Sequence, residues 1–530
     1  MNRRRCRTAA LAGAMFPLTF VGSTRAAAPA WSGYANDPFH AANAPAASDP
    51  LSSIRWQTPV DLSPQFSGND LLIHYGSPTI TAANTLLVPV KTGASGGFEI
   101  NAINGATGSS KWSVTSDYVL PPHNWVPSYS PALTPNNRMY YAGAGGTIYW
   151  RDTLDGAAPS AAHQLAFFGD ANYAANPSAY NSNVFINTPI TSDASGNIYF
   201  GFRVTGSTPL GAGLSSGIAR IGADGSETFT SAAAAAGGDA VINNDLMNCA
   251  PALSRDGSKL YITLTGGGVG DLVSLNSSTL APQAHVRLKD PASGADAEVT
   301  DDGSASPTVG PDGHVYMGVL ENPFPSNHDR GWMLHYTGDL SAQKTTGAFG
   351  WDDTASIVPA SMVPGYAGPS SYLLMTKYNN YAGLGGDGVN KLAILDPNAT
   401  ETDPVTGATV MKEVLSIAGV TPDGEFPSKP GAVREWCINS AVVDPSTDSI
   451  LANSEDGKLY RWDLGTNTFM QVITLTPGVG EAYTPTLVGP DGAVYAINNA
   501  TLFSVVPEPT SGAMVIASVT LVLARRRRHV

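Results

Sequence analysis

The sequence is poor in charged residues and in cysteine. Asp, Glu, Lys and Arg make up only 14% of the 530 residues, and there are 3 cysteines. Gly and Pro are abundant instead: 56 Gly and 39 Pro give about 18% of the chain, against a usual share of roughly 12%. This composition excludes a coiled coil, a helical bundle, a collagen and a charge-rich disordered chain. It indicates an all-β protein, and a hydrophobic content of 42% suffices for a large core.

The N-terminus has the three parts of a secretory signal. Arg3, Arg4, Arg5 and Arg7 precede a largely apolar stretch over residues 8–22, and small residues follow at 26–28. The apolar stretch is too short to span a membrane. We therefore expect a signal peptide over 1–28, a linker over 29–50, and an exported protein.

The C-terminus, residues 506–530, has a different three-part pattern. Pro507, Glu508 and Pro509 precede an uncharged run over 512–524 and four arginines at 525–528. This tail resembles a PEP-CTERM sorting signal. The resemblance implies a short transmembrane segment, cleavage by a sorting protease of the exosortase type, transient membrane anchoring and delivery to the cell surface or extracellular matrix. A plain membrane anchor is the alternative, because 13 helical residues rise only about 20 Å.

Removing both ends makes the rest of the chain strongly acidic. Nine of the 29 basic residues and Glu508 lie in the end segments, so roughly 20 basic and 42 acidic groups remain. A net charge near −22 repels phosphates and anionic lipid, so we expect no nucleic acid partner. Neutral polymers, cations and basic proteins remain as partners.

A repeat over residues 51–505 predicts the fold. A small residue, usually followed by Pro, precedes two or three apolar positions, a turn and an aromatic-rich strand. The eight copies begin at Ser77, Ser130, Thr188, Ala250, Ser306, Val358, Ser440 and Thr484. Each fits four short strands, which is the sequence mark of a β-propeller. We expect one all-β propeller of eight four-stranded blades, with seven as the alternative.

The two ends of the repeat region complete each other. The eighth copy offers three strands before the tail begins, and residues 54–60, around Trp56, resemble the outer strand around Trp112 in the first copy. Pairing of these N- and C-terminal strands would close the ring and remove an exposed sheet edge.

Residues 104–112 of the first copy read NGATGSSKW, and this resembles the repeat of PQQ-like (quinoprotein-type) propellers. The resemblance implies that Trp112 packs between neighbouring blades. Quinoprotein dehydrogenases of this fold also have adjacent cysteines and a calcium site, whereas no two cysteines of this chain are adjacent. We therefore predict no cofactor, regard PQQ binding as contrary to the sequence, and leave calcium open. Cys249 and Cys437 fall in non-adjacent units, which favours two buried free thiols over a disulfide.

Other motifs point to loops rather than to chemistry. Gly-x-Ser-x-Gly at 93–97 and 213–217, and Gly-x-Gly-x-x-Gly at 383–388, lie in Gly-rich loops without the helices they require. The nine histidines show no zinc-binding spacing, so we predict no metal ligands.

Loop lengths predict the functional face. The loops between second and third strands and those between blades are long in several copies, and both classes emerge on one face of a propeller. Long loops on a rigid scaffold are where function tends to lie. The candidate ligand-binding residues at the channel mouth there are His74, His123, Trp125, Asp245, Asp302, Arg434, Glu435, Trp436 and Glu481. They could equally be loop caps in a solvated funnel.

These features favour a non-catalytic surface module that binds an extracellular polymer or a surface protein. The alternative is a polysaccharide-active enzyme that pairs Asp302 with Glu435 or Glu481. An assembly scaffold is a third reading, against which the sorting tail argues.

Overall fold

The computed structural model describes residues 28–68, 70–301, 303, 305–478 and 483–508. The predicted signal peptide, apart from Ala28, and the sorting tail beyond Glu508 lie outside these residues. Within them, no helix has the length and apolar character needed to cross a bilayer.

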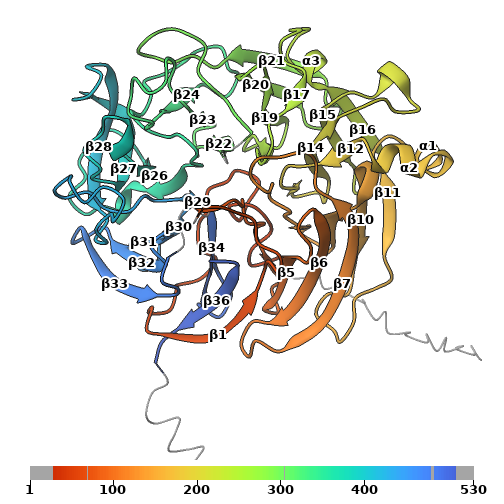
Figure 1. The fold of residues 1–530 in the computed structure, drawn as a ribbon, viewed down its shortest axis with the longest axis horizontal. Coiled ribbons are helices and arrows are strands. Elements are labelled where there is room, and N and C mark those ends of the chain that lie inside the picture. The colour runs from red at the N-terminus through yellow and green to blue at the C-terminus, as the bar shows by residue number, and fades with distance from the viewer. Residues whose placement is uncertain (1–27, 69, 302, 304, 479–482, 509–530) are drawn as a thin grey trace, which may run out of the picture.

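The chain forms a ring of eight blades around a central axis, which confirms the all-β propeller (Figure 1). Each of the eight repeat copies supplies the inner strands of one blade. Blade 1 consists of β4 (Thr79–Ile80), β5 (Thr85–Lys91), β6 (Gly96–Asn104) and β7 (Ser110–Val119), and blade 2 of β8 (Ala132–Leu133), β9 (Met139–Ala142), β10 (Thr147–Arg151) and β11 (His163–Ala166). Blade 3 consists of β12 (Val184–Ile186), β13 (Thr191–Ser192), β14 (Ile198–Val204), β15 (Gly217–Ile221) and β16 (Glu227–Ser231). Blade 4 consists of β17 (Asn244–Asp245), β18 (Ala252–Leu253), β19 (Lys259–Gly266), β20 (Val269–Asn276) and β21 (Pro282–Arg287).

Blades 5 to 7 and the closing blade follow in the same order. Blade 5 consists of β22 (Thr308–Val309), β23 (Val315–Val319) and β24 (Trp332–Tyr336), and blade 6 of β25 (Ser356–Pro359), β26 (Tyr372–Tyr378), β27 (Lys391–Thr402) and β28 (Thr409–Ala418). Blade 7 consists of β30 (Val442–Asp444), β31 (Ser449–Asn453), β32 (Lys458–Asp463) and β33 (Thr468–Thr474). Blade 8 consists of β34 (Thr484–Val488), β35 (Val494–Asn498), β36 (Thr501–Val506) and β1 (Ser53–Pro59), with β29 (Ile438–Ser440) parallel to β34.

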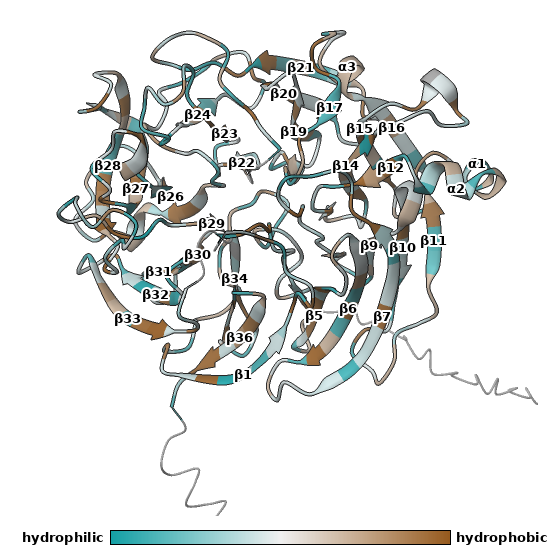
Figure 2. Ribbon diagram, viewed as in Figure 1, coloured by the Kyte–Doolittle hydropathy of each residue, from teal (hydrophilic) through white to brown (hydrophobic). Residues whose placement is uncertain are grey.

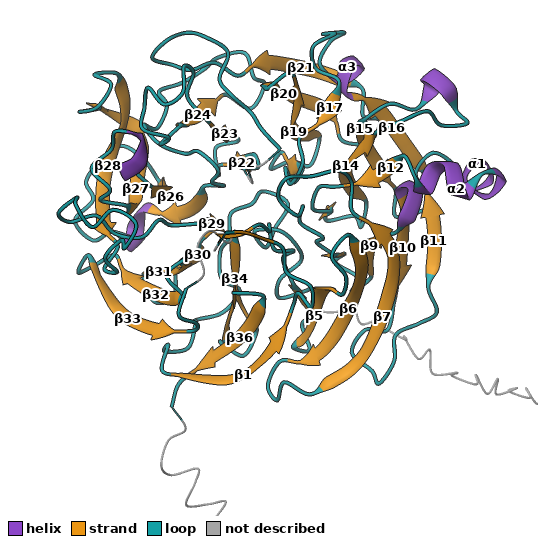
Figure 3. Ribbon diagram, viewed as in Figure 1, coloured by secondary structure: helices purple, strands orange, loops and turns teal. Residues whose placement is uncertain are grey.

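Blade 5 departs from the expected four strands. The described chain forms three strands there, and residues after β24 return only as isolated bridges at Gln343 and Gly347. The short helices α1 (Asp170–Ala175), α2 (Pro177–Asn181) and α3 (Ala232–Ala235) lie in connections at the periphery of the ring (Figure 3).

The ring closes as predicted. β1 pairs antiparallel with β36, from Ser53 opposite Val506 to Pro59 opposite Thr501, and so becomes the outer strand of blade 8. Trp56 on β1 donates its indole N–H to the Gly105 carbonyl of blade 1 at 2.9 Å. Trp112 on β7 makes the same bond to Leu154 of blade 2 at 3.0 Å, so the outer-strand tryptophans join neighbouring blades.

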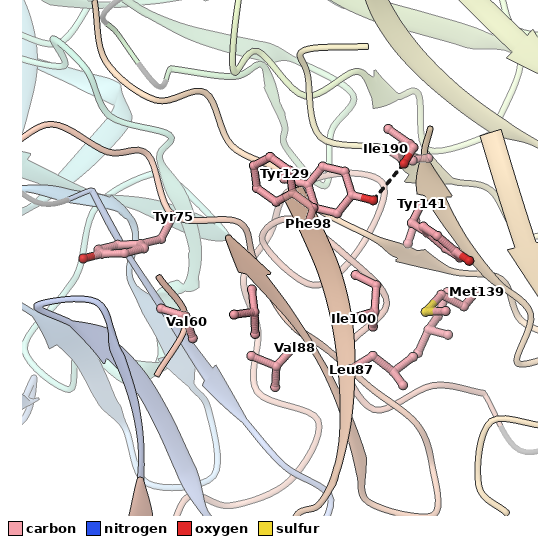
Figure 4. Packing of buried hydrophobic residues seen from close by; sticks show 14 of the residues in the cluster. Val60, Tyr75, Leu87, Val88, Phe98, Ile100, Tyr129, Met139, Tyr141 and Ile190 are labelled. Atoms are coloured by element: carbon pink, nitrogen blue, oxygen red, sulfur yellow. Dashed lines mark hydrogen bonds between the residues drawn. The ribbon is translucent and has the colours of Figure 1, made fainter. Parts of the chain in front are cut away.

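The core lies between the blades. Alternate residues of β6, among them Phe98 and Ile100, are buried, as expected for a strand with one inward face. Phe98 stacks on Tyr129, which precedes blade 2, with ring centroids 4.3 Å apart, and Tyr141 of β9 packs nearby (Figure 4). Aromatic contacts of this kind fix one blade against the next.

The expected linker over 29–50 lies inside the propeller instead. Residues 29–49, which we call the strap, run around the centre of the ring and are mostly buried or half-buried (Figure 1). The strap passes the Ile190 carbonyl of blade 3 at Gly33 and makes backbone hydrogen bonds to the other seven blades. These join Trp31 to Ile80, Ser32 to Leu133, Pro38 to Leu253, Phe39 to Val309, Ala41 to Ile357, Ala42 and Ala44 to Val443, and Asp49 to Gly492.

Elementary chemistry explains the strap. The innermost strand of each blade has an edge that faces the axis, and unpaired backbone groups there would be costly if buried. The strap supplies partners for them. Its small residues fit the narrow centre, and left-handed conformations at Ala35, Asn36, His40 and Ala42 allow it to turn from blade to blade. The segment is therefore part of the propeller.

Candidate binding face

Strand direction defines the candidate face. Neighbouring strands of each blade are antiparallel, so the starts of first and third strands and the ends of second and fourth strands lie at the same face. The long connections between blades, and the long loop between β23 and β24, therefore emerge together. We call this side the long-loop face. The predicted ligand-binding residues that the structure describes belong to it.

An aromatic cluster sits where blades 8, 1 and 2 meet. His74 stacks on Tyr483 with centroids 4.2 Å apart, and Trp125 contacts both rings edge-on at 6.0 and 5.5 Å. Lys377 of blade 6 reaches over Tyr483, with its Nζ 5.8 Å from the ring centroid. His74 is only 1% exposed, whereas Trp125 is half-buried. Of the two predicted residues, Trp125 is thus the one that can meet a ligand.

Asp245 is buried in an ion pair rather than open to the mouth. Its carboxylate lies 3.3 Å from Arg203, which also contacts Asp301 at 2.6 Å. Burial raises the pKa of Asp245 to about 6, because the loss of solvent outweighs the favourable charge of Arg203. The carboxylate is completely inaccessible, so its role is to hold blades 3 to 5 together at the mouth.

Arg434 and Glu435 precede the inner strand of blade 7 and are half-buried. Arg434 contacts Glu425 at 2.9 Å and Glu455 at 3.6 Å, and the Glu435 backbone N–H donates to the Glu455 carboxylate at 3.2 Å. Burial raises the pKa of Glu435 above its usual range, and the negative charges of Asp423 and Glu425 add to this. These groups form an acidic cluster that is already internally paired.

The remaining predicted residues divide into three groups. Trp436 is 1% exposed and packs against Tyr460 and Phe469, so it is a core residue. His123 is half-buried, and its Nδ1 lies 2.7 Å from the Pro121 carbonyl. Asp302 and Glu481 lie outside the described residues, as do the carboxylate pairs that include them.

Several mouth residues were missed. Asp353 is buried beside Lys377, whose backbone N–H donates to it at 3.2 Å, and burial raises the pKa of Asp353 to about 7. Asp353 precedes the inner strand of blade 6, so its position in the repeat is the signal that could have found it. Lys377 and Arg203 lie within second strands, where no local pattern distinguishes them from structural residues.

The long-loop face also carries most of the exposed large apolar side chains. Nine such residues are exposed in the described chain, and six belong to this face: Leu62, Phe66, Val119, Val241, Phe324 and Val420. The other three lie on the outer strands β1 and β33, the latter coloured apolar near its end in Figure 2. Loops on a rigid scaffold carry function more often than the strands they connect, and a contiguous apolar patch formed by such loops is a candidate interaction site.

A separate cavity of about 600 Å³ lies between blades 6 and 7, away from the mouth. Tyr366, Asp396, Leu415 and Leu464 line it. The Asp396 carboxylate accepts hydrogen bonds from Tyr366 and Ser370, so its polar atoms already have partners. The Asp396 carboxylate is therefore already hydrogen-bonded within the protein and does not mark the cavity as a ligand site.

Adjacent cysteines, which accompany the quinone in dehydrogenases of this fold, do not occur in this chain. Cys249 and Cys437 are both buried and form no disulfide with each other, as expected. No cluster of three or more His, Cys, Asp or Glu side chains suited to a metal occurs among the described residues. We therefore derive no chemistry through the quinone.

Comparison with known proteins identifies the fold. No known family profile and no curated protein sequence matches the chain. Among solved structures, a europium-containing methanol dehydrogenase superposes with a TM-score of 0.54 at 10% identity, over 88% of this chain and 89% of that one. The quinohemoprotein alcohol dehydrogenase of Comamonas testosteroni gives 0.51 at 11% identity, over 92% and 83% of the two chains. A quinohemoprotein alcohol dehydrogenase of Pseudomonas putida gives a TM-score of 0.50 at 12% identity, over 88% of this chain and 75% of that one. These three similarities establish the fold alone.

Proposed function

We propose that this chain is an exported, non-catalytic binding module that presents its long-loop face to an extracellular polymer or a surface protein. The observation that carries the proposal is the concentration of exposed apolar side chains on that face, six of nine in the described chain. A rigid ring of eight blades holds these loop tips in fixed positions. Preorganisation of that kind lowers the entropic cost of binding.

The pairing of the polar groups supports a binding role over catalysis. Asp245 is paired with Arg203, His74 is stacked and buried, and the Glu455 carboxylate accepts a hydrogen bond from the Glu435 backbone N–H.

The two ends supply the route to the exterior. The signal-like N-terminus leads to export, and the tail containing Pro507, Glu508 and Pro509 leads to transient membrane anchoring and processing by an exosortase-type protease. The mature protein would then lie at the cell surface or in the matrix. Its acidic body suits neutral or basic partners.

A glycan array probed with the purified full chain, with and without calcium, tests the polymer side of the proposal. Saturable binding that falls about tenfold or more in Trp125→Ala, and stays unchanged in Met470→Ala on β33, would support it. Binding that responds to Met470→Ala and not to Trp125→Ala would place the site elsewhere. Turnover of a glycan by the chain would favour the enzyme instead.

A further inference from the structure

Three exposed apolar residues lie at the long-loop face of blade 1, on segments that hydrogen bonds join to one another. Leu62 is 55% exposed, Phe66 49% and Val119 47%. Leu62 and Phe66 belong to the connection from β1 to blade 1, which contains the hairpin β2 (Phe66–Ser67) and β3 (Asp70–Leu71). Val119 ends β7. We call these three side chains the blade-1 ridge.

Backbone and side-chain hydrogen bonds join the three segments through one loop of blade 1, residues 91–97. The Leu62 N–H donates to the Lys91 carbonyl at 2.8 Å, and the Gln65 side chain donates to the Ala94 carbonyl. The Leu120 N–H donates to Ser95 at 3.3 Å, and Val119 pairs with Gly96. The ridge residues are therefore held at neighbouring positions.

A buried ion pair between Lys91 and Asp61 fixes the segment of the ridge that carries Leu62. Lys91 Nζ lies 2.9 Å from Asp61, and both side chains are at most 1% exposed. Lys91 also donates to the carbonyls of Ser63 and Gly93. The segment that carries Leu62 is thus fixed to blade 1 by a charged contact that is protected from solvent and salt.

The exposed charges on the segments that carry the ridge are negative. The exposed charged side chains on these segments at this face are Asp70 and Asp117, and Lys91 is buried and paired. The other lysine of these segments, Lys111, lies at the opposite end of β7 and donates to Thr85 and Asp155. An apolar surface with an acidic border complements an apolar surface with a basic border.

We infer that the blade-1 ridge is the docking site for a protein partner that presents an apolar segment flanked by lysine or arginine. This inference rests on the proposed function and gives the partner its chemical class. Leu62 and Phe66 are the expected anchors, because large apolar side chains at fixed positions carry most of the binding energy of protein interfaces. An anionic membrane or an acidic polysaccharide would be repelled by Asp70 and Asp117.

The test uses the purified full chain and three short peptides of equal length. One is an amphipathic peptide of leucine and lysine; the others replace leucine with serine or lysine with glutamate. The chain variants are Leu62→Ser with Phe66→Ser, and the matched control Met470→Ser with Val472→Ser, which removes equally exposed apolar side chains from β33. Circular dichroism confirms that each variant retains its strands, and fluorescence anisotropy reports binding.

We expect saturable binding of the leucine–lysine peptide alone. The ridge variant should weaken this binding about tenfold or more, and the β33 variant should leave it unchanged. Equal binding by the serine–lysine peptide would overturn the inference, because charge alone would then suffice. Absence of leucine–lysine binding, or binding indifferent to the ridge variant, would also overturn it.

Two further results separate this inference from the proposed function. Glycan binding that depends on Trp125 but not on the ridge would refute the ridge and leave the binding module standing. Ridge-dependent binding to phosphatidylcholine vesicles in place of the peptide would refute the protein partner in favour of lipid. Failure of glycans, peptides and vesicles alike would count against both proposals.

Discussion

Replacement of Trp31 by alanine should destabilise the propeller strongly. The residue belongs to a segment with the composition of a linker, yet its side chain is 1% exposed and packs in the main core. Removal of a buried tryptophan typically costs about 3–5 kcal/mol. The indole N–H of Trp31 has no hydrogen-bond partner in the described structure, and its removal offsets part of that cost. We therefore expect a loss near the lower end, about 3 kcal/mol.

The assay is urea denaturation of the full chain followed by far-UV circular dichroism. Trp31→Phe serves as the matched variant: it keeps a ring in the core and removes the unpaired N–H, so its midpoint should stay close to that of the unmodified chain. The backbone bonds between Trp31 and Ile80, at 2.9 and 3.1 Å, persist in both variants. An alanine variant that unfolds at the original midpoint would refute the packing of the strap in the core.

Three other perturbations test separate parts of the account. Burial lowers the pKa of His40 from 6.5 to about 4, so the unfolded chain binds the proton more readily than the folded one. The free energy of unfolding should therefore fall by up to about 3 kcal/mol between pH 6.5 and 4. His40→Gln should show a smaller loss over the same pH range, and identical pH profiles for the two chains would exclude His40 as the cause. Arg203→Met leaves Asp245 buried without its partner and should cost about 3–5 kcal/mol, most of which Asp245→Asn in the same chain should restore; an unchanged midpoint in Arg203→Met would contradict the ion pair. Burial raises the pKa of Cys249 to about 12, and Cys437 is also buried, so a thiol reagent should modify neither until denaturant is added; reaction of either in the folded chain would disprove their burial.

The sequence predicted the ring because its signals are local and repeated. The small-residue signature, followed by proline in seven of the eight copies, marks the start of each blade, so eight copies predict eight blades. Trp56 and Trp112 indicated the closing strand, since both occupy the same place in an outer strand and both bond to the next blade. Blade 5 escaped this reasoning because an irregular segment replaces its fourth strand.

The strap could not be found in the same way. It touches each blade with only one or a few residues, and most of its hydrogen bonds to the blades come from backbone groups, which carry no residue signature. Its alanines and prolines indicate a linker, because its apolar residues follow neither the spacing of a helix nor the alternation of a strand. The central ring of unpaired strand edges, which explains its position, exists only once the propeller has closed.

The sequence indicated that the candidate residues share one face, but it did not indicate their surroundings. Positions before inner strands do cluster at one face, as Trp125, Arg434 and Glu435 show. Burial of His74, Asp245 and Trp436 depends on partners such as Tyr483, Arg203 and Tyr460, which are distant in sequence or carry no motif. The exposed apolar loop tips had no pattern at all, because exposure of a single side chain is a property of the folded surface.

Hydroxyl-radical footprinting of the full chain tests the central claim most directly. The chain would be saturated with the array glycan or the leucine–lysine peptide, and oxidation of individual side chains compared with the free chain. The account predicts protection of side chains on the long-loop face, above all Leu62, Phe66 and Trp125, with Met470 and Val472 of β33 unchanged. Protection of β33 without protection of the long-loop face would contradict it.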